Sequence, residues 1–366
     1  MNIICQHELC TGCSACINVC PKHCIKMDPD QYGVLLPEIN QQECIDCGLC
    51  VKICPVNTPA EFNNPNKCFA VWQTDRLTLK KSASGGVAAS LYLYFIQHLR
   101  GVVYGVSWDK ELRPVFKRTE RVEDLELFKG SKYVQAFVND IYQYVKEDLL
   151  NNRQVLFVGT PCQIAGLKNY LRKDYHQLFT CDLVCHGVPP YEYFKDEISK
   201  IYKSPKLQVT NCRFRGNDEY NYHFSLWNND TLLYDKKGSR SYYFYGFLTS
   251  IILRESCYSC KYSTNIRIGD ITLGDFIGIG KLQSIKDQPK NLSVVTINSK
   301  KAQLIWTDLL EKYPTISSEI RPYKEAVRGG GSFRQPTIRN PKRDKFLEDY
   351  KRYGWNKGKH SANYRY

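Results

Sequence analysis

Short apolar runs and amphipathic stretches alternate along most of the chain, and this pattern predicts a mixed α/β protein. Apolar or alternating runs predict strands at 67–73, 102–108, 113–119, 155–158, 179–185, 208–215, 222–227, 232–234 and 292–297. Apolar residues at helical spacing predict helices at 87–100, 122–128, 141–150, 164–171, 191–202 and 302–312. Because strands and helices follow one another irregularly, we expect one main mixed sheet.

Residues 1–62 depart from this pattern, because two copies of one cysteine motif dominate them around short predicted strands at 25–27 and 34–36. The first copy is Cys10, Cys13, Cys16, Cys20 and Pro21, and the second is Cys44, Cys47, Cys50, Cys54 and Pro55. Both read C-x2-C-x2-C-x3-C-P, the spacing of bacterial 4Fe-4S ferredoxins. Zinc knuckles usually show two separated C-x2-C pairs, and a disulfide framework has no reason to repeat this spacing with its proline. We therefore predict a small ferredoxin-like domain with two 4Fe-4S clusters.

Each cluster is expected to take three ligands from one motif and the fourth from the other. Three closely spaced thiolates can converge on one cubane, while the cysteine before each proline points toward the other cluster. The predicted ligands of the first cluster are Cys10, Cys13, Cys16 and Cys54. Those of the second are Cys44, Cys47, Cys50 and Cys20.

Composition adds a cellular setting. The chain is 43% hydrophobic and 24% charged, which is ordinary for a globular protein. The apolar stretches at 87–96 and 242–253 are too short to span a membrane. The chain has 17 cysteines, which are clustered in spaced motifs, and its sequence does not open on the charged and apolar pattern of a secretion signal. Both features favour a reducing environment. We therefore expect a cytoplasmic protein.

The net charge of +14 is unevenly distributed. Residues 1–60 carry three basic and six acidic side chains, whereas residues 334–366 carry ten basic and three acidic ones. A linker-like segment at 57–67, rich in proline and asparagine, completes a division into 1–62, 63–320 and a basic tail at 321–366. The tail can bind nucleic acid, stay solvated or dock on an acidic partner. Nucleic acid is disfavoured because no recognised nucleic-acid motif accompanies the charge.

Two glycine-containing loops of the larger domain are candidates for binding a phosphate-bearing cofactor. Ser84, Gly85 and Gly86 precede a predicted helix, whose first N–H groups favour an anion. Residues 129–134 bring a glycine, a lysine and hydroxyl groups together after a helical run. The simpler alternatives are a tight turn for the first loop and a helix C-cap before an edge strand for the second.

Four further thiols stand outside the repeated motif. Cys162 follows Gly159 and Thr160 between a predicted strand and helix, where the helix dipole should lower the pKa of its thiol. A buried structural cysteine is the alternative. Cys185 and the C-x2-C pair Cys257/Cys260 complete the set, but spacing supports only the pair, which also suits zinc or a redox-active dithiol. The cysteines without a partner pattern are expected to be structural: Cys5, Cys24, Cys68, Cys181 and Cys212.

Taken together, these motifs resemble the coenzyme F420 hydrogenase/dehydrogenase beta-subunit family with an N-terminal dicluster ferredoxin domain. The segments that carry the resemblance are 84–87 (SGGV), 130–135 (GSKYVQ), 159–163 (GTPCQ), 182–189 (DLVCHGVP), 257–261 (CYSCK) and 269–276 (GDITLGDF). Members of this family are flavoproteins that pass electrons between FAD, iron–sulfur clusters and a partner cofactor or subunit. Some reduce a deazaflavin coenzyme, and bacterial members occur in gene clusters for surface polysaccharides.

The resemblance implies a flavin-binding larger domain with its own cluster. It places a third 4Fe-4S cluster at Cys162, Cys185, Cys257 and Cys260. It places FAD near Ser84, Gly85, Gly86, Gly130, Ser131, Lys132, Tyr133, Gln135, Gly159 and Thr160. Asp275, with Asp270, would orient the site or bind a flavin or substrate group, or cap a turn. His186 would be a proton donor or a hydrogen-bond partner of cluster sulfurs.

Three functional classes follow from these features. The leading one is an iron–sulfur flavoprotein oxidoreductase acting on a small molecule or a deazaflavin, with a redox partner protein. The second is a non-catalytic electron-transfer subunit that supplies a partner enzyme. The third, an iron–sulfur protein that binds nucleic acid, depends on the basic tail alone.

Overall fold

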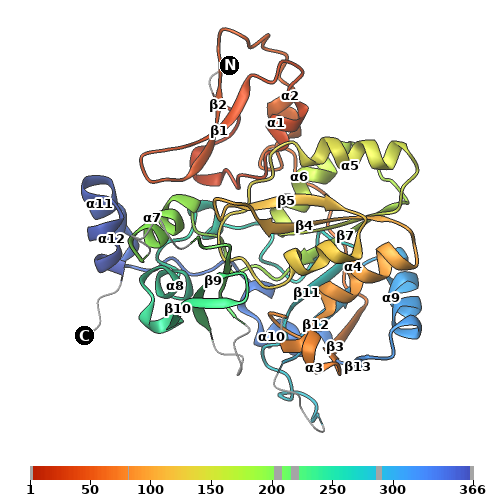
Figure 1. The fold of residues 1–366 in the computed structure, drawn as a ribbon. Helices are drawn as coiled ribbons and strands as arrows, with labels where there is room; N and C mark the ends of the chain where they lie inside the picture. The colour runs from red at the N-terminus through yellow and green to blue at the C-terminus, as the bar shows by residue number, and fades with distance from the viewer. Residues whose placement is uncertain (1–2, 81, 202–207, 216–221, 286–290, 363–366) are drawn as a thin grey trace.

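The computed structural model describes residues 3–80, 82–201, 208–215, 222–285 and 291–362. A small N-terminal module stands on one side of a larger body that is built around an eight-stranded sheet (Figure 1). None of the helices in the described ranges is both long and apolar enough to cross a membrane. The mixed α/β class and the small ferredoxin-like N-terminal region are confirmed.

The N-terminal module consists of one hairpin and three short helices. β1 (Ile25–Pro29) pairs antiparallel with β2 (Leu35–Ile39), with Ile25 opposite Ile39. The helices are a 3-10 turn η1 (His7–Leu9), α1 (Ala15–Val19) and α2 (Leu49–Ile53). α1 and α2 each begin within a cysteine motif and contact each other, and α1 also contacts α6 (Pro161–Leu171) of the larger body. The predicted strands at 25–27 and 34–36 are confirmed as this hairpin.

The main sheet has the order β13-β3-β12-β11-β7-β6-β4-β5. Its strands are β3 (Lys67–Gln73), β4 (Val102–Trp108), β5 (Pro114–Thr119), β6 (Val155–Gly159), β7 (Leu178–Leu183), β11 (Ile271–Asp275), β12 (Ser293–Ile297) and β13 (Ile316–Ile320). β11, β7, β6 and β4 are parallel neighbours. β3 runs in the same direction, because antiparallel pairings with β12 connect it to β11. The C-terminal ends of these five strands share one edge of the sheet, here called the carboxyl edge.

Helices cover both faces of this sheet. α4 (Val87–Gln97), the 3-10 helix η2 (Val122–Phe128) and α9 (Lys300–Lys312) share one core, and α5 (Ile141–Leu150) and α6 (Pro161–Leu171) share the other. β6 supplies both cores in alternation: Leu156 and Val158 face the first, whereas Val155 and Phe157 face the second. Successive strand side chains point to opposite faces, so an uncharged run can fill two cores at once.

A smaller aromatic core lies beside the main sheet. It joins a three-stranded sheet to helices from distant parts of the chain. The elements are α7 (Tyr191–Ile201), β8 (Asn211–Arg213), β9 (His223–Asn228), β10 (Thr231–Lys237), η3 (Gly238–Arg240), α8 (Tyr242–Leu248), η4 (Glu255–Cys257), α11 (Arg343–Tyr353) and α12 (Trp355–Ala362). The remaining short helices are α3 (Arg76–Lys80), α10 (Tyr323–Gly329) and η5 (Gly331–Phe333).

Much of the predicted basic tail is folded onto this aromatic core. Phe346 is 0% and Trp355 2% exposed, and Trp355 Nε1 donates a hydrogen bond to Glu197 at 2.8 Å. α11 and α12 lie against α7 and α8 in Figure 1. Lys345, Lys351, Arg352 and Lys357 are exposed, whereas Phe346, Trp355 and Arg343 are buried. A wholly solvated tail is therefore excluded for residues 343–362.

Every strand and helix predicted from the sequence pattern is present, with shifted ends. The segment at 122–128 is a 3-10 helix, and the strand predicted at 208–215 is limited to β8. Elements that the pattern analysis did not anticipate include α1, α2, α3, α8, β13, α10, α11, α12 and the other 3-10 turns.

Candidate iron–sulfur and cofactor site

The structure brings the cysteines of the two motifs together across the repeat. Cys10, Cys13 and Cys16 line one cavity with Cys54, and all four are buried. This first cysteine cavity has apolar walls that include Ile4, Met27, Pro37 and Val56. Four thiols in an apolar enclosure are the donor set that a 4Fe-4S cubane requires, so the residues fit such a cluster.

The second cysteine cavity has the reciprocal composition. It is lined by Cys44, Cys47, Cys50 and Cys20, together with apolar residues such as Ile25 and Ile39. Cys47 is exposed, and Cys44 and Cys50 are half-buried. Three of the four thiols of the second cavity are therefore more accessible to solvent than those of the first.

Local backbone geometry explains why the motif makes such cavities. Gly12 and Gly48 adopt φ values of +68° and +70°, a conformation that glycine reaches without steric cost. These left-handed residues turn the chain back so that the first three cysteines of each motif face one point. A hydrogen bond from Cys5 and backbone N–H groups of Val56 and Asn57 lower the pKa of the Cys54 thiol to about 7. Such donors stabilise a thiolate ligand.

Two cysteines that we predicted to be structural also line these cavities. Cys5 lies in the first cavity, where it hydrogen-bonds with Cys10 and Cys54, and Cys24 lies in the second, 3.4 Å from Cys20 between the two Sγ atoms. The sequence carries no spacing signal for either residue, since neither belongs to the repeated motif. Only the fold shows that each cavity holds a fifth thiol.

The four further thiols of the larger domain gather at its boundary with the N-terminal module. Cys162 lies in the first turn of α6, Cys185 follows β7, and Cys257 and Cys260 lie in and after η4. We call these four residues the interface cysteines. A Cβ built on Gly187 would lie 3.1 Å from the Cβ of Cys257, so the loop after β7 touches η4. The thiols of Cys162, Cys257 and Cys260 all act on Cys185 and raise its pKa further than burial alone.

The expected effect of the helix dipole on Cys162 is overturned. Burial, followed by the charge of Cys260, raises the pKa of the Cys162 thiol to about 11, and these effects exceed the hydrogen bond from Thr160. Thr160 Oγ1 lies 3.2 Å from Cys162 Sγ, and Gln163 Oε1 accepts the Thr160 N–H at 2.9 Å. A thiol with a raised pKa must lose its proton when it binds iron.

α6 lies between the interface cysteines and the first cysteine cavity, and it contacts both, since Cys162 belongs to its first turn and Gly166 packs against Cys13. A Cβ on Gly166 of α6 would lie 3.0 Å from Cys13 Sγ. The charge of Cys162 also raises the pKa of Cys13, although burial and the charges of other thiols have larger effects. The two thiol sets are therefore neighbours.

No group of three or more His, Cys, Asp or Glu side chains in the described ranges is arranged to hold a single metal ion. A mononuclear zinc site at Cys257 and Cys260 is not formed by the described residues.

The predicted cofactor loops lie at or near the carboxyl edge of the sheet. Ser84 Oγ donates to the Leu292 carbonyl at 3.1 Å, and the Gly85 N–H donates to Ser293 Oγ at 2.9 Å. Gly86 has a φ of +82° at the start of α4. These contacts hold a tight turn against β12. Gly159 and Thr160 end β6 at the same edge, where ligands of open α/β sheets usually bind.

The loop at 130–135 has two parts with different surroundings. Lys132 Nζ donates to the carbonyls of Lys129 and Gly130 at 3.2 and 3.3 Å, and burial lowers the pKa of Lys132 to about 7. Tyr133, after Ser131, stacks on Phe247 with ring centroids 4.5 Å apart. Gln135 instead turns toward the N-terminal module, where it accepts a hydrogen bond from Arg254 at 2.6 Å.

The two predicted catalytic residues have partners within the protein. Asp275 forms an ion pair with Arg215 at 2.6 Å, a partner that the sequence pattern did not reveal. Tyr133 is near both groups, because their charges act on its hydroxyl. His186 Nε2 lies 3.2 Å from the Phe247 carbonyl and 3.1 Å from Ser250 Oγ. Burial lowers the pKa of His186, so its imidazole is neutral at pH 7.

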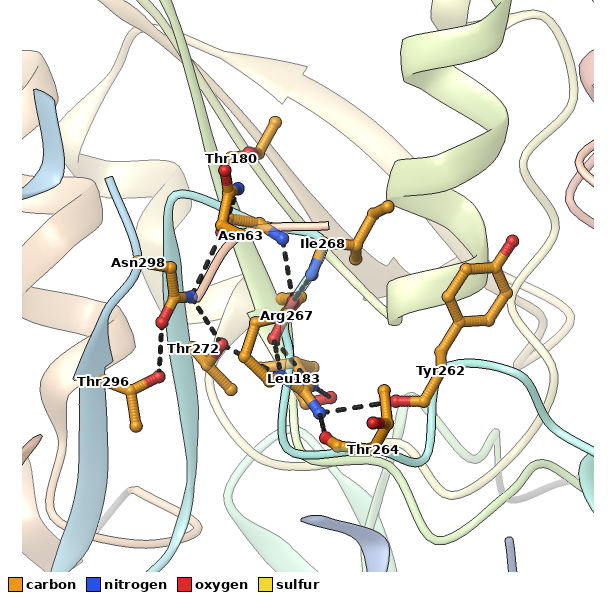
Figure 2. A network of polar contacts seen from close by, with 12 residues as sticks. Asn63, Thr180, Leu183, Tyr262, Thr264, Arg267, Ile268, Thr272, Thr296 and Asn298 are labelled. Carbon is orange, nitrogen blue, oxygen red and sulfur yellow. Dashed lines mark hydrogen bonds and ion pairs between the residues drawn. The ribbon is translucent and has the colours of Figure 1, made fainter. Parts of the chain in front are cut away.

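A buried polar network around Arg267 and Ile268 holds the residues that lead into β11 against the end of β7 (Figure 2). Arg267 Nη2 binds Asp182 at 2.8 Å, and both side chains are almost fully buried. The Asn63 and Arg267 backbones exchange hydrogen bonds, which anchors the linker from the N-terminal module. Asn298 donates to Thr272 Oγ1 at 2.9 Å and to the Gly269 carbonyl at 3.1 Å.

Asp270 belongs to this structural framework. It accepts from the backbone N–H and the hydroxyl of Thr180, each at 2.8 Å, and from Ser299 at 2.8 Å. These contacts match the turn-capping alternative for Asp270, because its carboxylate is used to join three segments of the chain.

Comparison with known families identifies both parts of the chain. Residues 152–320 match the model for the C-terminal part of the coenzyme F420 hydrogenase/dehydrogenase beta subunit. Residues 9–58 match the model for a 4Fe-4S dicluster domain. A chain of the F420-reducing NiFe hydrogenase complex from Methanosarcina barkeri is 17% identical with a TM-score of 0.48, and the match covers 82% of this chain and 91% of that one. No curated protein matches the sequence.

Proposed function

Because this chain belongs to the coenzyme F420 hydrogenase/dehydrogenase beta-subunit family and carries a 4Fe-4S dicluster domain, we propose that it is an iron–sulfur flavoprotein oxidoreductase. The chain is an iron–sulfur electron-transfer protein. Its proposed reaction partners are a small molecule or a deazaflavin coenzyme on one side and a redox protein on the other.

The observation that carries the proposal is the arrangement of three thiol sets. The first and second cysteine cavities would each hold one 4Fe-4S cluster, and the interface cysteines would hold a third beside the first cavity. When bound, these clusters would supply one-electron transfer and FAD would supply hydride chemistry. The chain would supply the thiolate ligands, buried ones at the first cavity and an exposed one, Cys47, at the second, where a redox partner would dock.

The carboxyl edge is the proposed flavin site. Burial lowers the pKa of Lys132 to about 7, and a bound anionic group such as a phosphate would favour its charged form. Tyr133 offers an aromatic face, while Arg215 and Asp275 can hydrogen-bond a ring or a substrate. Ser84, Gly85, Gly86, Gly130, Ser131, Gly159 and Thr160 would line the same edge.

A second candidate function is a non-catalytic electron-transfer subunit. It is favoured by the internal partners of the proposed acid–base groups, since Asp275 is paired with Arg215 and His186 is hydrogen-bonded to Phe247 and Ser250. Such a subunit would hold clusters and flavin without turning over a substrate alone. Its catalytic partner would dock near the exposed Cys47.

Iron, sulfide and flavin content of anaerobically purified protein tests the proposal. We expect about twelve irons and twelve sulfides per chain, at four per cubane, with about one FAD. About eight irons without flavin after reconstitution would contradict the proposed role of the larger domain. Reduction of bound flavin by a small-molecule donor, measured without any partner protein, then separates the oxidoreductase from the electron-transfer subunit.

Variants of the C-x2-C pair locate the third set of irons. The double variant Cys257→Ser/Cys260→Ser should lose about four irons and keep about eight, because it removes two of four thiolate ligands. Cys212→Ser is the matched control, since Cys212 is buried in the aromatic core and lines neither cysteine cavity. Unchanged iron content in the double variant would show that the interface cysteines hold no cluster.

A further inference from the structure

A buried arginine joins the N-terminal module to the interface cysteines. Arg254 is 1% exposed and directly precedes η4. Its Nη2 donates to the Cys10 carbonyl at 2.8 Å, and its Nη1 donates to the Leu35 carbonyl at 3.0 Å and to Gln135 Oε1 at 2.6 Å. All of these acceptors are uncharged, and the Nε atom has no hydrogen-bond partner among the residues that the structure describes.

The other fully buried arginines differ in one respect. Arg267 is paired with Asp182, Arg321 with Glu325 and Arg343 with Glu255. No ion pair of Arg254 with a carboxylate is formed by the residues that the structure describes. A guanidinium cannot lose its charge in a protein, and an unpaired buried charge is strongly unfavourable. An anionic group at this position would compensate the charge.

Both neighbouring thiol sets can supply that negative charge. Arg254 lies beside the first cysteine motif, because it donates a hydrogen bond to the Cys10 carbonyl. A Cβ built on Gly12, which also lines the first cysteine cavity, would be 3.2 Å from Arg254 Nη1. Arg254 also lies beside the interface cysteines, because its carbonyl accepts the Cys257 N–H at 3.1 Å at the start of η4. Its hydrogen bonds to the N-terminal module are to the carbonyls of Leu35 and of Cys10, a residue of the first cysteine cavity.

We propose that Arg254 is a redox-positioning residue: its uncompensated charge raises the midpoint potential of the cluster in the first cysteine cavity above that of the cluster in the second. The inference rests on the proposed function, since it requires both clusters. One electron enters the cluster on reduction, no bond forms or breaks, and a buried cation favours the more negative, reduced state. Electrons from a low-potential donor at the exposed second cavity are thereby drawn inward.

Anaerobic redox titration monitored by electron paramagnetic resonance (EPR) tests this assignment. Arg254→Met removes the charge, and Gln135→Glu keeps Arg254 but places a carboxylate on its Nη1. In both variants the reduced-to-oxidised ratio of the first cluster at fixed potential should fall on the order of tenfold, since one charge acts through an effective dielectric of about 20. Tenfold is about 59 mV for one electron. The second cluster is the reference within the same molecule.

Two further variants sharpen the comparison. Arg254→Lys retains the charge and should stay near the wild-type ratio. Lys26→Gln removes an exposed cation of the module that is already paired with Asp28 and Glu38, and it should leave both clusters nearly unchanged. The signal of the second cluster is identified by its shift in Cys47→Ser, because that ligand is the exposed one.

Each outcome decides the question. A selective fall for the first cluster in Arg254→Met and Gln135→Glu supports the proposal. Equal ratios in wild type and Gln135→Glu with full iron content overturn it, and so does an equal shift of both clusters. If Arg254→Met loses iron, the ratio measured in Gln135→Glu is decisive. Wild-type protein that binds no pair of clusters would instead refute the proposed function, which iron analysis reveals separately.

Discussion

The Cys54→Ala variant is expected to lose the cluster of the first cysteine cavity and to keep that of the second, although Cys54 belongs to the second motif. Cys54 is enclosed with Cys10, Cys13 and Cys16, whereas Cys20 completes the other cavity. A cubane with only three thiolates cannot retain its full ligand set. Iron and sulfide should each fall by about four per chain. The EPR signals that persist should include that of the second cavity.

The reciprocal variant and a double variant make this test specific. Cys50→Ala should remove the second cluster and spare the first, because Cys50 lines only the second cavity. Cys5 hydrogen-bonds with Cys54 and is the one thiol able to replace it, so Cys5→Ala/Cys54→Ala eliminates such compensation. Loss of the second cluster in Cys54→Ala would mean that each motif binds its own cluster.

The sequence predicted those parts of the fold that depend on local pattern. The run Val155–Val158 carries no charge, and it is a buried central strand because alternate side chains fill cores on opposite faces. The helix start at Cys162 was also predicted from local sequence, because Thr160 and Pro161 are residues typical of the first positions of a helix. The repeated cysteine spacing predicted which thiols share a cavity.

Contacts between distant segments could not be predicted in this way. Arg215 pairs with Asp275 across 60 residues, and Arg254 bonds to Cys10 across 244 residues. Cys5 and Cys24 carry no spacing signal, and their positions follow only from how the module folds. The pKa of Cys162 depends on burial and on Cys260, neither of which is visible in the local sequence.

The C-terminal helices are an intermediate case. Their net positive charge suggested a tail, but Phe346 and Tyr350 stand four residues apart, which is a helical signal that could have been used. Tyr193 of α7 contacts Phe346, Tyr350 and Trp355 by their rings. Burial of these aromatic side chains stabilises the helices, while basic side chains such as Lys351 and Arg352 remain exposed to water.

The largest expected effect on stability comes from the buried ion pair of Figure 2. Asp182 is 0% exposed and accepts from Arg267 Nη2 at 2.8 Å, from the Gly269 N–H at 2.8 Å and from the Ile268 N–H at 3.1 Å. Asp182→Ala leaves the Arg267 guanidinium buried without its counter-charge and two N–H groups without an acceptor. The free energy of unfolding, measured by urea denaturation, should fall by about 3–5 kcal/mol.

Two controls separate charge from packing in this prediction. Asp182→Leu/Arg267→Met removes both charges and should recover much of the loss, because a buried pair replaced by apolar side chains is often near neutral. Glu120→Gln breaks the exposed pair with Arg153 and should cost less than about 1 kcal/mol. If Asp182→Ala lowered the free energy of unfolding as little as Glu120→Gln does, the polar network would not be responsible for holding the Asn63 linker against β7 and β11. Because Cys185 follows closely after Asp182 at the end of β7, a severe loss would also be expected to disturb the interface cysteines.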